Sequence, residues 1–371
     1  MKPYRLSCFV LTALIGCSSG PVDLGDPGVK DDVPLDPGRD GDHNDRPGDV
    51  EQDPGPKNPD TSTPANAPET VLEATSLAEV DEIRSFDLAG GKLFYSGAHD
   101  NSISLYRYDI ASKANVLVAR DHGGAPFAAD ENGFFYAGLT AYPVVQKAVV
   151  GMPLTSTTHA PEWFSSYETI ATAVAVDPGK VYWIERGELH TFFRIANRTA
   201  FTLPPSPAYA FGPSVPNNSE TFEHLVIDQG VGYTAGDRGR LVRFDMEIAT
   251  TVLTSGGPKS GFVLDDSNLY WVDGTDLKAL PKGAPAGSSP SVITSLPSDA
   301  TNVLGGAGPK GVYVLSQPSA GADSGKVLRI DPATGTPTEL VTKLGGLRAG
   351  AFIEKSLYFV TSKGVLRLKD G

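Results

Sequence analysis

Apolar and polar positions along most of the chain follow one pattern of short alternating runs. A turn followed by two or three apolar or aromatic residues returns seven times, with its central residues at positions 94, 135, 182, 232, 270, 313 and 358. An apolar run precedes each copy, as at 173–176, and an alternating run and a last short run come after it, as at 103–108 and 116–118. A period of two residues is typical of β-strands. The pattern therefore predicts seven units of four strands each, and no segment has the period and length of an apolar helix.

The spacing of these units predicts how they assemble. Successive copies are 38 to 50 residues apart, which is the length of a four-stranded blade of a β-propeller. We expect an all-β fold over residues 71–371, a seven-bladed β-propeller, with six or eight blades as the alternatives. The last copy ends without a fourth strand, whereas Glu69–Glu73 precedes the first copy and reads much like Thr338–Leu344. This N-terminal segment is therefore predicted to be the outer strand that closes the ring.

The first residues of the chain have the layout of a secretory signal. Two basic residues precede an apolar run over 6–15, which is too short for a membrane-spanning helix of ~20 residues. Residues 1–16 are thus expected to be removed. The sequence Leu14–Cys17 resembles the lipobox of bacterial lipoproteins, and this resemblance implies that Cys17 is acylated and anchors the mature chain in a membrane. Ser18, directly after the cysteine, is typical of lipoproteins of the outer membrane, facing the periplasm or the cell surface.

Residues 17–70 differ sharply in composition from residues 71–371. Between residues 18 and 70 there are eleven Asp, two Glu, four Lys or Arg and ten Pro. Such a segment cannot bury enough apolar surface to fold by itself, so we predict a disordered acidic tether that starts at the lipidated cysteine. The segment carries −9 of the net charge of −13, and residues 71–371 carry −6. An acidic ring without a basic stripe argues against binding to nucleic acid.

One stretch of the tether partly matches a calcium-binding loop. Asp40, Asp42, Asn44 and Glu51 occupy positions 1, 3, 5 and 12 of the EF-hand pattern. Asp45 stands where that loop requires glycine, and no amphipathic helix flanks the stretch. We therefore predict at most an unstructured association of calcium with these four residues and no EF-hand.

Two of the seven phrases, Tyr270–Asp273 and Tyr182–Glu185, resemble the Tyr-Trp-Thr-Asp repeats of the low-density-lipoprotein-receptor class of propellers. The resemblance covers residues 71–371 loosely, and Gly232–Tyr233 and Tyr313–Val314 depart from it. It implies a propeller, which in that class usually has six blades, and it carries over no catalytic residue. We expect the aromatic residues to pack between blades, because Tyr and Trp bury a large area on a pleated surface.

Several short sequences match the letters of a catalytic or nucleotide motif in the wrong context. Gly306–Gly311 fits G-x-G-x-x-G but precedes a predicted strand, so we expect a blade turn there, and likewise at Ser255–Ser260. His99–Asp100 and Asp121–His122 place a base beside an acid, yet neighbours in a strand point to opposite faces. The six histidines show no spacing typical of metal ligands. The sequence thus assigns no catalytic residue and no cofactor.

Arginines recur in the third predicted strand of several units. They are Arg107, Arg194, Arg243, Arg329 and Arg367. We expect a ladder of exposed or blade-bridging charges. The alternative is that they face the central channel and form an anion site.

Two classes of function remain open. We favour a lipid-anchored binding or scaffold protein, monomeric, whose long loops at 204–218 and 281–290 contact a protein or glycan partner at one face of the ring. The alternative is a propeller enzyme of the lyase, lactonase or quinoprotein kind, which requires carboxylates, His or Asn to converge on the central channel. Its candidate residues are His99, Asp100 and Asp273. The fold by itself does not decide between the two classes.

Overall fold

The computed structural model describes residues 67–369, apart from 74–79, 81, 100–101, 121–125, 141–145, 155–161, 166–169, 189, 198–211, 217–219, 246 and 322. The predicted signal peptide, Cys17 and the four calcium candidates lie outside the described residues. No helix in the part that is described has the length and apolar character needed to cross a membrane.

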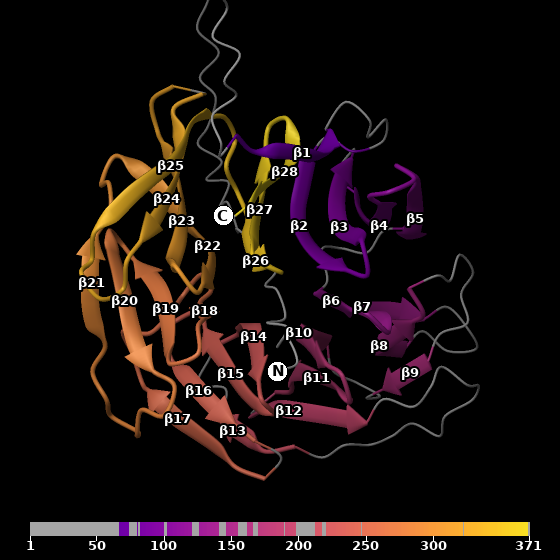
Figure 1. The fold of residues 1–371 in the computed structure, drawn as a ribbon. Coiled ribbons are helices and arrows are strands. Elements are labelled where there is room, and N and C mark those ends of the chain that lie inside the picture. Colours follow the sequence, from indigo (N-terminus) through magenta and orange to yellow (C-terminus); the bar gives the residue numbers. More distant parts are fainter. Residues whose placement is uncertain are drawn as a thin grey trace, which may run out of the picture. The chain divides into compact units, whose positions relative to one another are not determined.

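The described chain forms seven antiparallel sheets of four strands each, set around a ring as the blades of a β-propeller (Figure 1). The seven-bladed all-β prediction is thus confirmed. Blades 1 to 3 are β2 (Glu82–Ala89), β3 (Lys92–His99), β4 (Ser102–Asp109) and β5 (Asn115–Ala119); β6 (Phe127–Asp130), β7 (Gly133–Thr140), β8 (Gln146–Met152) and β9 (Glu162–Ser165); β10 (Ile170–Asp177), β11 (Lys180–Arg186), β12 (His190–Asn197) and β13 (Ser214–Pro216). Blades 4 and 5 are β14 (Phe222–Asp228), β15 (Val231–Gly236), β16 (Leu241–Phe244) and β17 (Ala249–Leu253); β18 (Val263–Leu264), β19 (Asn268–Asp273), β20 (Asp276–Pro281) and β21 (Ser291–Ser295). Blades 6 and 7 are β22 (Ala300–Gly308), β23 (Gly311–Pro318), β24 (Gly325–Ile330) and β25 (Pro337–Leu344); β26 (Gly350–Ile353), β27 (Ser356–Thr361), β28 (Gly364–Lys369) and β1 (Glu69–Glu73).

The first strand of each blade is the innermost, and these seven strands surround the axis of the ring (Figure 1). Each recurring aromatic phrase forms the second strand. Because the strands alternate in direction, the turns from first to second strand and from third to fourth strand lie at one end of the ring, here called the hairpin end. The turns from second to third strand and the connections between blades lie at the other end, here called the linker end.

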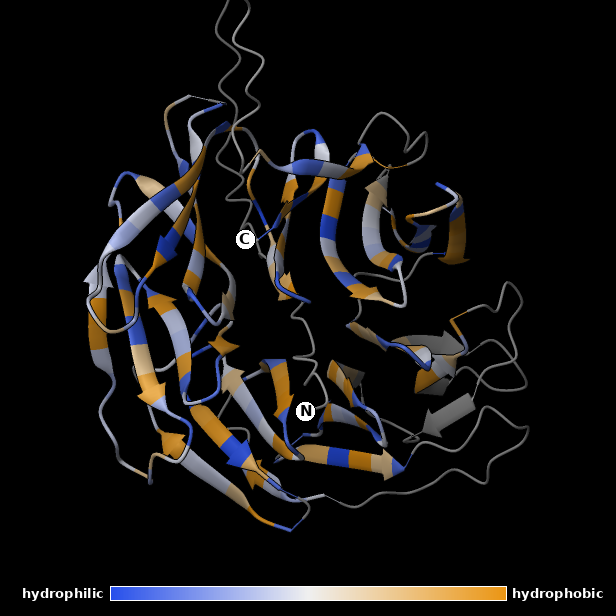
Figure 2. Cartoon of the chain, viewed as in Figure 1, coloured by the Kyte–Doolittle hydropathy of each residue, from blue (hydrophilic) through white to orange (hydrophobic). Residues whose placement is uncertain are grey.

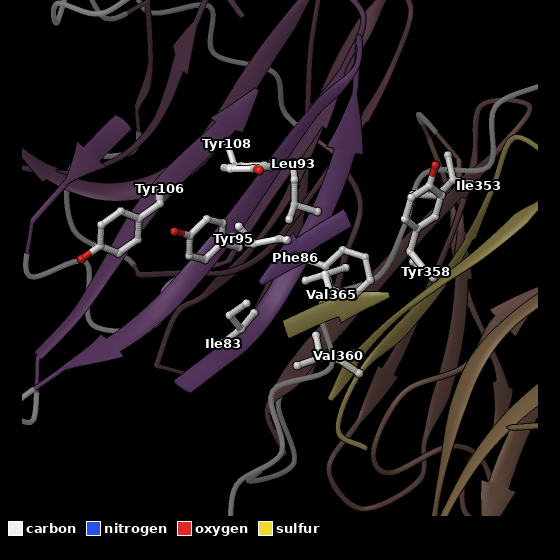
Figure 3. Close-up of a cluster of buried hydrophobic side chains, with 13 residues drawn as sticks. Ile83, Phe86, Leu93, Tyr95, Tyr106, Tyr108, Ile353, Tyr358, Val360 and Val365 are labelled. Carbon is white, nitrogen blue, oxygen red and sulfur yellow. The ribbon is translucent and has the colours of Figure 1, made fainter. Parts of the chain in front are cut away.

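The N-terminal strand closes the ring, as predicted. Strand β1 pairs with β28 in blade 7, with Leu72 opposite Val365 and Thr70 opposite Leu366. Leu72 is 0 % exposed and belongs to the core between blades 7 and 1. Figure 3 shows this core, to which Phe86 comes from blade 1 and Val365 from blade 7. The pairing joins the two ends of the propeller and covers the edge of β28.

The apolar core consists of clusters between neighbouring blades. Strands carry apolar residues in alternation with polar ones, which Figure 2 shows as alternating colours along the ribbons. Trp271, Tyr182 and Tyr270 are among the largest fully buried side chains, and Phe193 stacks on Phe244 with ring centroids 4.3 Å apart across blades 3 and 4. The expectation that the aromatic phrases pack between blades is therefore confirmed.

Candidate functional site

Near the linker end of three innermost strands, one residue at an equivalent position leaves the blade pairing. In β2, β10 and β14 the pairing with the next strand skips one residue, respectively Arg84, Thr172 and Glu223. Each skipped residue lies five positions before the residue that directly precedes the two-residue turn at the hairpin end. A β-bulge of this kind leaves its residue without ladder bonds and redirects the side chain. Three blades therefore present a side chain at the same height around the axis.

Blades 5 and 7 place exposed residues at this height as well. Counted in the same way from their turns, the equivalent residues are Ser260 before β18 and Arg348 before β26. Blade 6 departs from this arrangement: its equivalent residue, Val303, pairs with Leu315 and packs on the core between blades 6 and 7, and the skipped residue of its innermost strand is Gly305. We call the polar members the inner rim: Arg84, Thr172, Glu223, Ser260 and Arg348. The equivalent residue of blade 2 lies outside the described residues.

The inner rim is positive where blades 7 and 1 meet. The Arg348 side chain pairs with Glu82 across the junction of the two blades. Arg84 Nε lies 3.9 Å from the second carboxylate oxygen of Glu82. Both arginine side chains are 47 % exposed. Two guanidinium groups thus share one carboxylate, which leaves one net positive charge at this side.

The inner rim is negative at blade 4. Neighbouring atoms partly shield the Glu223 carboxyl from water, which raises its pKa. The nearby Asp237 raises this pKa further, and Arg186 lowers it. Arg186 comes from blade 3 and donates to Thr221 Oγ1 at 2.7 Å, so it crosses between the two blades. Two carboxylates with one guanidinium leave one net negative charge here.

A buried ion pair supports the rim at blade 4. Arg240 Nε lies 2.8 Å from Glu220 Oε2, and both side chains are less than a tenth exposed. The other oxygen of Glu220 accepts the amides of Arg238 and Arg240, at 3.2 and 3.1 Å, in the turn from β15 to β16. Gly236 leaves room for this carboxylate, because a Cβ there would lie 2.1 Å from Glu220 Oε1. A buried pair with its remaining lone pairs satisfied fixes the local backbone.

A second bond ties the rim of blade 3 to blade 4. Thr172 Oγ1 donates to the carbonyl of Phe222 at 2.5 Å, between the innermost strands β10 and β14. The backbone next to Glu223 is therefore held from both neighbouring sides, by Thr172 and by the Glu220 pair. The rim at blade 4 is built on a rigid base.

The hairpin end has a different construction. Every first hairpin turns through two residues, as between Asp177 and Lys180. In several turns one Asp oxygen accepts two amides of its own turn, as Asp177 Oδ1 does from Gly179 at 2.9 Å and Lys180 at 2.7 Å. These aspartates act as turn caps, as expected for an Asp that opens a tight turn.

Of the candidates for an enzyme in a central channel, Asp273 can be placed. It lies on β19, the second strand of blade 5, and pairs with Lys278 at 2.7 Å. It therefore does not line the axis. The side chain of His99, together with Asp100 and the pair Asp121–His122, lies outside the described residues.

Two of the five third-strand arginines bridge neighbouring blades, one of the two roles predicted for them. Arg107 donates to the carbonyl of Leu154 at 2.7 Å, and Arg243 donates to the carbonyl of Lys282 at 3.3 Å. Each acceptor lies shortly beyond the third strand of the next blade. The alternative that these arginines form an anion site at the axis is wrong for both, because the third strand is not the innermost one.

The other three arginines occupy the corresponding strands β12, β24 and β28. Arg194 pairs with the buried Glu185 of its own blade at 2.8 Å. Arg367 pairs with Glu69, so it joins the last strand to the N-terminal one. Arg329 stands opposite Tyr313 in the ladder of blade 6, again on a third strand and away from the axis.

The glycine-rich sequence Gly306–Gly311 is a blade turn, as predicted. A Cβ at Gly306 would lie 2.6 Å from the Cβ of Phe352, and one at Gly308 would lie 2.5 Å from the ring of the same residue. Gly311 has a φ of +144, and a Cβ at this position would lie 2.3 Å from the carbonyl oxygen of Ile330. Close packing of blades 6 and 7 explains these glycines without a nucleotide. Ser255–Ser260 is likewise a connection, in which Gly257 donates to the carbonyl of Gly239 at 2.8 Å.

The loop at 281–290 is fastened to the neighbouring blade. Lys282 Nζ lies 2.7 Å from Asp228 Oδ2 of blade 4, and Ala284 is buried in the core between blades 4 and 5. Gly287 donates its amide to the carbonyl of Val252 on the outer strand of blade 4. This loop therefore has a structural role at the hairpin end. Most of the other predicted binding loop, 204–218, lies outside the described residues.

The inner rim was not predicted from the sequence, although one signal for it exists. Its members stand at a constant distance before the turn of the first hairpin, which can be counted once the turns are assigned. Alternation alone hides them, because a bulge changes the face of the strand that a residue occupies. Among the described residues, no group of three or more His, Cys, Asp or Glu side chains could hold a metal ion.

Comparisons with known proteins support the fold and give no information on the activity. No family model and no curated protein matches the chain. A chain in the crystal structure of a mitotic checkpoint complex is 9 % identical, with 82 % of this chain and 95 % of that chain covered and a TM-score of 0.51. The computationally designed Ika8 protein is 11 % identical over 78 % of this chain and 83 % of its own, with a TM-score of 0.47. BamB from Moraxella catarrhalis is 13 % identical over 75 % of this chain and 79 % of its own, with a TM-score of 0.42. Of these three, the checkpoint-complex chain has a TM-score above 0.5, and at 9 % identity its likeness shows the fold alone.

Proposed function

We propose that the chain is a non-catalytic binding protein of the cell envelope, which contacts a protein or glycan partner through the linker end of its propeller. The observation that carries this proposal is the contrast between the two ends of the ring. At the hairpin end, aspartates are used to cap turns, and the loop after Pro281 is fastened to blade 4. At the linker end, exposed charges stand at equivalent positions, and the one at blade 4 lies beside a buried ion pair.

The arrangement suits recognition for a physical reason. Binding costs less when the recognising groups are already held in place, since little side-chain and loop entropy is then lost. The Glu220–Arg240 pair and the bond from Thr172 to Phe222 provide such support below Glu223. Charges of both signs at one end also favour a partner with complementary charges over others.

The chemistry of Cys17 supports the proposed location. Acyl chains contribute ~0.8 kcal/mol for each buried methylene, so two or more chains hold a protein on a bilayer without a spanning helix. Residues 17–68, which are rich in proline and aspartate, would link this anchor to the propeller, whose closing strand begins at Glu69. We place the protein in the outer membrane on the basis of Ser18.

A photocrosslinking experiment with the full chain in its own envelope tests which end binds. A benzophenone amino acid is placed at the exposed Arg238 or Lys363 of the linker end, and at the exposed Asn132 or Lys355 of the hairpin end as matched controls. We expect a product of discrete mass from the linker-end sites that excess unlabelled protein competes away. Products that form equally well at both ends, or at the hairpin end alone, would contradict the proposal.

The anchor has a separate test. The Cys17→Ala variant is expected to lose incorporation of labelled palmitate and to leave the membrane fraction on washing with salt. Equal labelling and equal retention of the variant would show that Cys17 is not the anchor, whatever the propeller binds.

A further inference from the structure

The inner rim carries opposite charges on opposite sides of the axis. Its positive side lies at the junction of blades 7 and 1, and its negative side lies at blade 4. In a ring of seven blades, blade 4 is three and a half steps from that junction in either direction. Figure 1 shows the innermost strands β26 and β2 facing β14 across the centre of the ring. The two charged sides are therefore as far apart as the rim allows.

The positive side is suited to a carboxylate. Arg84 and Arg348 are at equivalent positions of adjacent blades, and Glu82 between them neutralises one of the two charges. Guanidinium groups present planar sets of donors that match a carboxylate in a bidentate way. The exposed half of each side chain leaves donors available to a ligand that arrives from the solvent at the linker end.

The negative side is suited to an ammonium group. Glu223 is turned out of the blade pairing by its bulge and lies near Asp237. A second carboxylate nearby and partial burial both disfavour the charged form of Glu223, which the raised pKa of this group reports. Arg186 and Asp237 both bond to Thr221, and Arg186 offsets only part of the charge of the two carboxylates, so a further cation beside them is favourable. A compact ammonium with three donors meets that requirement.

We propose that the inner rim binds a peptide with free termini laid across the axis, its α-carboxylate at Arg84 and Arg348 and its α-ammonium at Glu223. This inference rests on the proposed function, since it assigns a ligand class to the linker end. Ser260 and Thr172 stand between the two charged sides, one on each side of blade 4. The main chain of the peptide crosses between the sides, so binding depends on its length and not on its side chains.

Isothermal titration of the detergent-extracted full chain with Gly-Ser peptides of two to eight residues tests the inference. We expect an optimum at one length, and about tenfold weaker binding when either the N-terminus is acetylated or the C-terminus is amidated, because a hydrogen bond to a charged group contributes ~1.5 kcal/mol or more. The Glu223→Gln variant should bind acetylated and free peptides equally. The double variant Arg84→Gln and Arg348→Gln should bind amidated and free peptides equally.

Arg238→Gln is the matched control, because Arg238 is exposed at the same end but is not on the inner rim. It should bind like the wild type, and thermal melting of all variants should agree, since exposed residues are replaced. Binding that ignores acetylation, binding that no rim variant changes, and the lack of binding at every length each overturn the inference. Crosslinks at the linker end without peptide binding would overturn this inference alone, whereas peptide binding with crosslinks only at the hairpin end would overturn the proposed function.

Discussion

His224 makes the stability of the propeller depend on pH. It lies on the innermost strand β14 and is 6 % exposed. Leu225 belongs to the core between blades 3 and 4 and Val226 to the core between blades 4 and 5, so alternation places His224 on the side of blade 5. The carbonyl of His224 accepts a bond from Thr234 at 2.6 Å, but its ring Nδ1 has no hydrogen-bond partner. Protonation would therefore bury a charge at this junction.

The size of the effect follows from the pKa of the imidazole. Burial lowers the pKa of His224 from 6.5 to about 4. The unfolded chain thus binds the proton more tightly than the folded chain does, so the free energy of unfolding is unaffected above pH 6.5 and falls as the pH drops below it. The loss is ~1.4 kcal/mol for each pH unit and totals about 3 kcal/mol by pH 4, where it levels off. Such a loss is a large part of the stability of an ordinary domain.

Urea unfolding of the full chain at intervals between pH 7.5 and 4.5 measures this dependence. We expect the His224→Gln variant to lose most of the slope of stability against pH, whereas His190→Gln keeps it, because His190 is exposed. Carboxylates contribute equally to wild type and variants, so the difference between the curves isolates His224. The reasoning is refuted if both variants keep the wild-type slope, or if the His224 ring titrates near pH 6.5 in the folded chain by NMR.

Three further substitutions have definite outcomes in the same unfolding assay. Leu72→Ala should lower the free energy of unfolding by about 3 kcal/mol, because it empties a fully buried site of the closing strand; an effect below ~1 kcal/mol would show that β1 does not hold the ring. Gly306→Ala should cost about 2 kcal/mol, since its φ of +141 and its close neighbours both oppose a Cβ, whereas Gly283→Ala, with nothing within 4 Å, should have no effect; equal effects would contradict this. Asp273→Glu should raise stability by about 1 kcal/mol by giving the buried Nε1 of Trp271 an acceptor, and an unchanged midpoint would speak against it.

The last of these substitutions comes from comparing two copies of one phrase. In blade 3, Trp183 Nε1 donates to Glu185 at 2.7 Å, and the other oxygen of that carboxylate meets Arg194 at 2.8 Å. Blade 5 has the same arrangement on β19 and β20, but its carboxylate is the shorter Asp273, which pairs with Lys278 and leaves Trp271 without a partner. The carboxylate of blade 5 is one methylene group shorter, and its cation is Lys278 where blade 3 has Arg194. The resemblance of the phrases was visible in the sequence, and this difference in bonding was not.

The fold was predictable because its signals are local and repeated. Several turns of the first hairpin have residues such as Asp177 and Gly179 at fixed places, and the aromatic strand comes directly after the turn. The closing strand was predictable as well, because a last unit with three strands requires a partner such as Glu69–Glu73. Such features follow from backbone hydrogen bonding and apolar burial, which depend on the type of residue and its position in the unit.

The acceptors of the third-strand arginines could not be predicted in the same way. Arg107 and Arg243 repeat at equivalent positions, so a shared role was expected for them. Their partners are main-chain carbonyls, of Leu154 and Lys282, and a carbonyl is present at every residue. The donor can therefore be identified in the sequence, but the acceptor cannot. Only the packing of one blade on the next determines which carbonyl accepts the bond.

The inner rim differs from these features because its residues do not repeat. Equivalent positions that serve the fold often hold similar side chains, as the aspartates before four of the seven first-hairpin turns do, since the same backbone task recurs there. At the rim the same backbone position holds Arg84, Thr172, Glu223, Ser260 and Arg348. A bulged residue makes no ladder bond and little core contact, so folding places few demands on its side chain. Variation there costs the ring little stability, and this freedom lets one end of a nearly symmetric propeller carry charges of opposite sign on opposite sides of its axis, as the proposed recognition of a two-ended ligand requires.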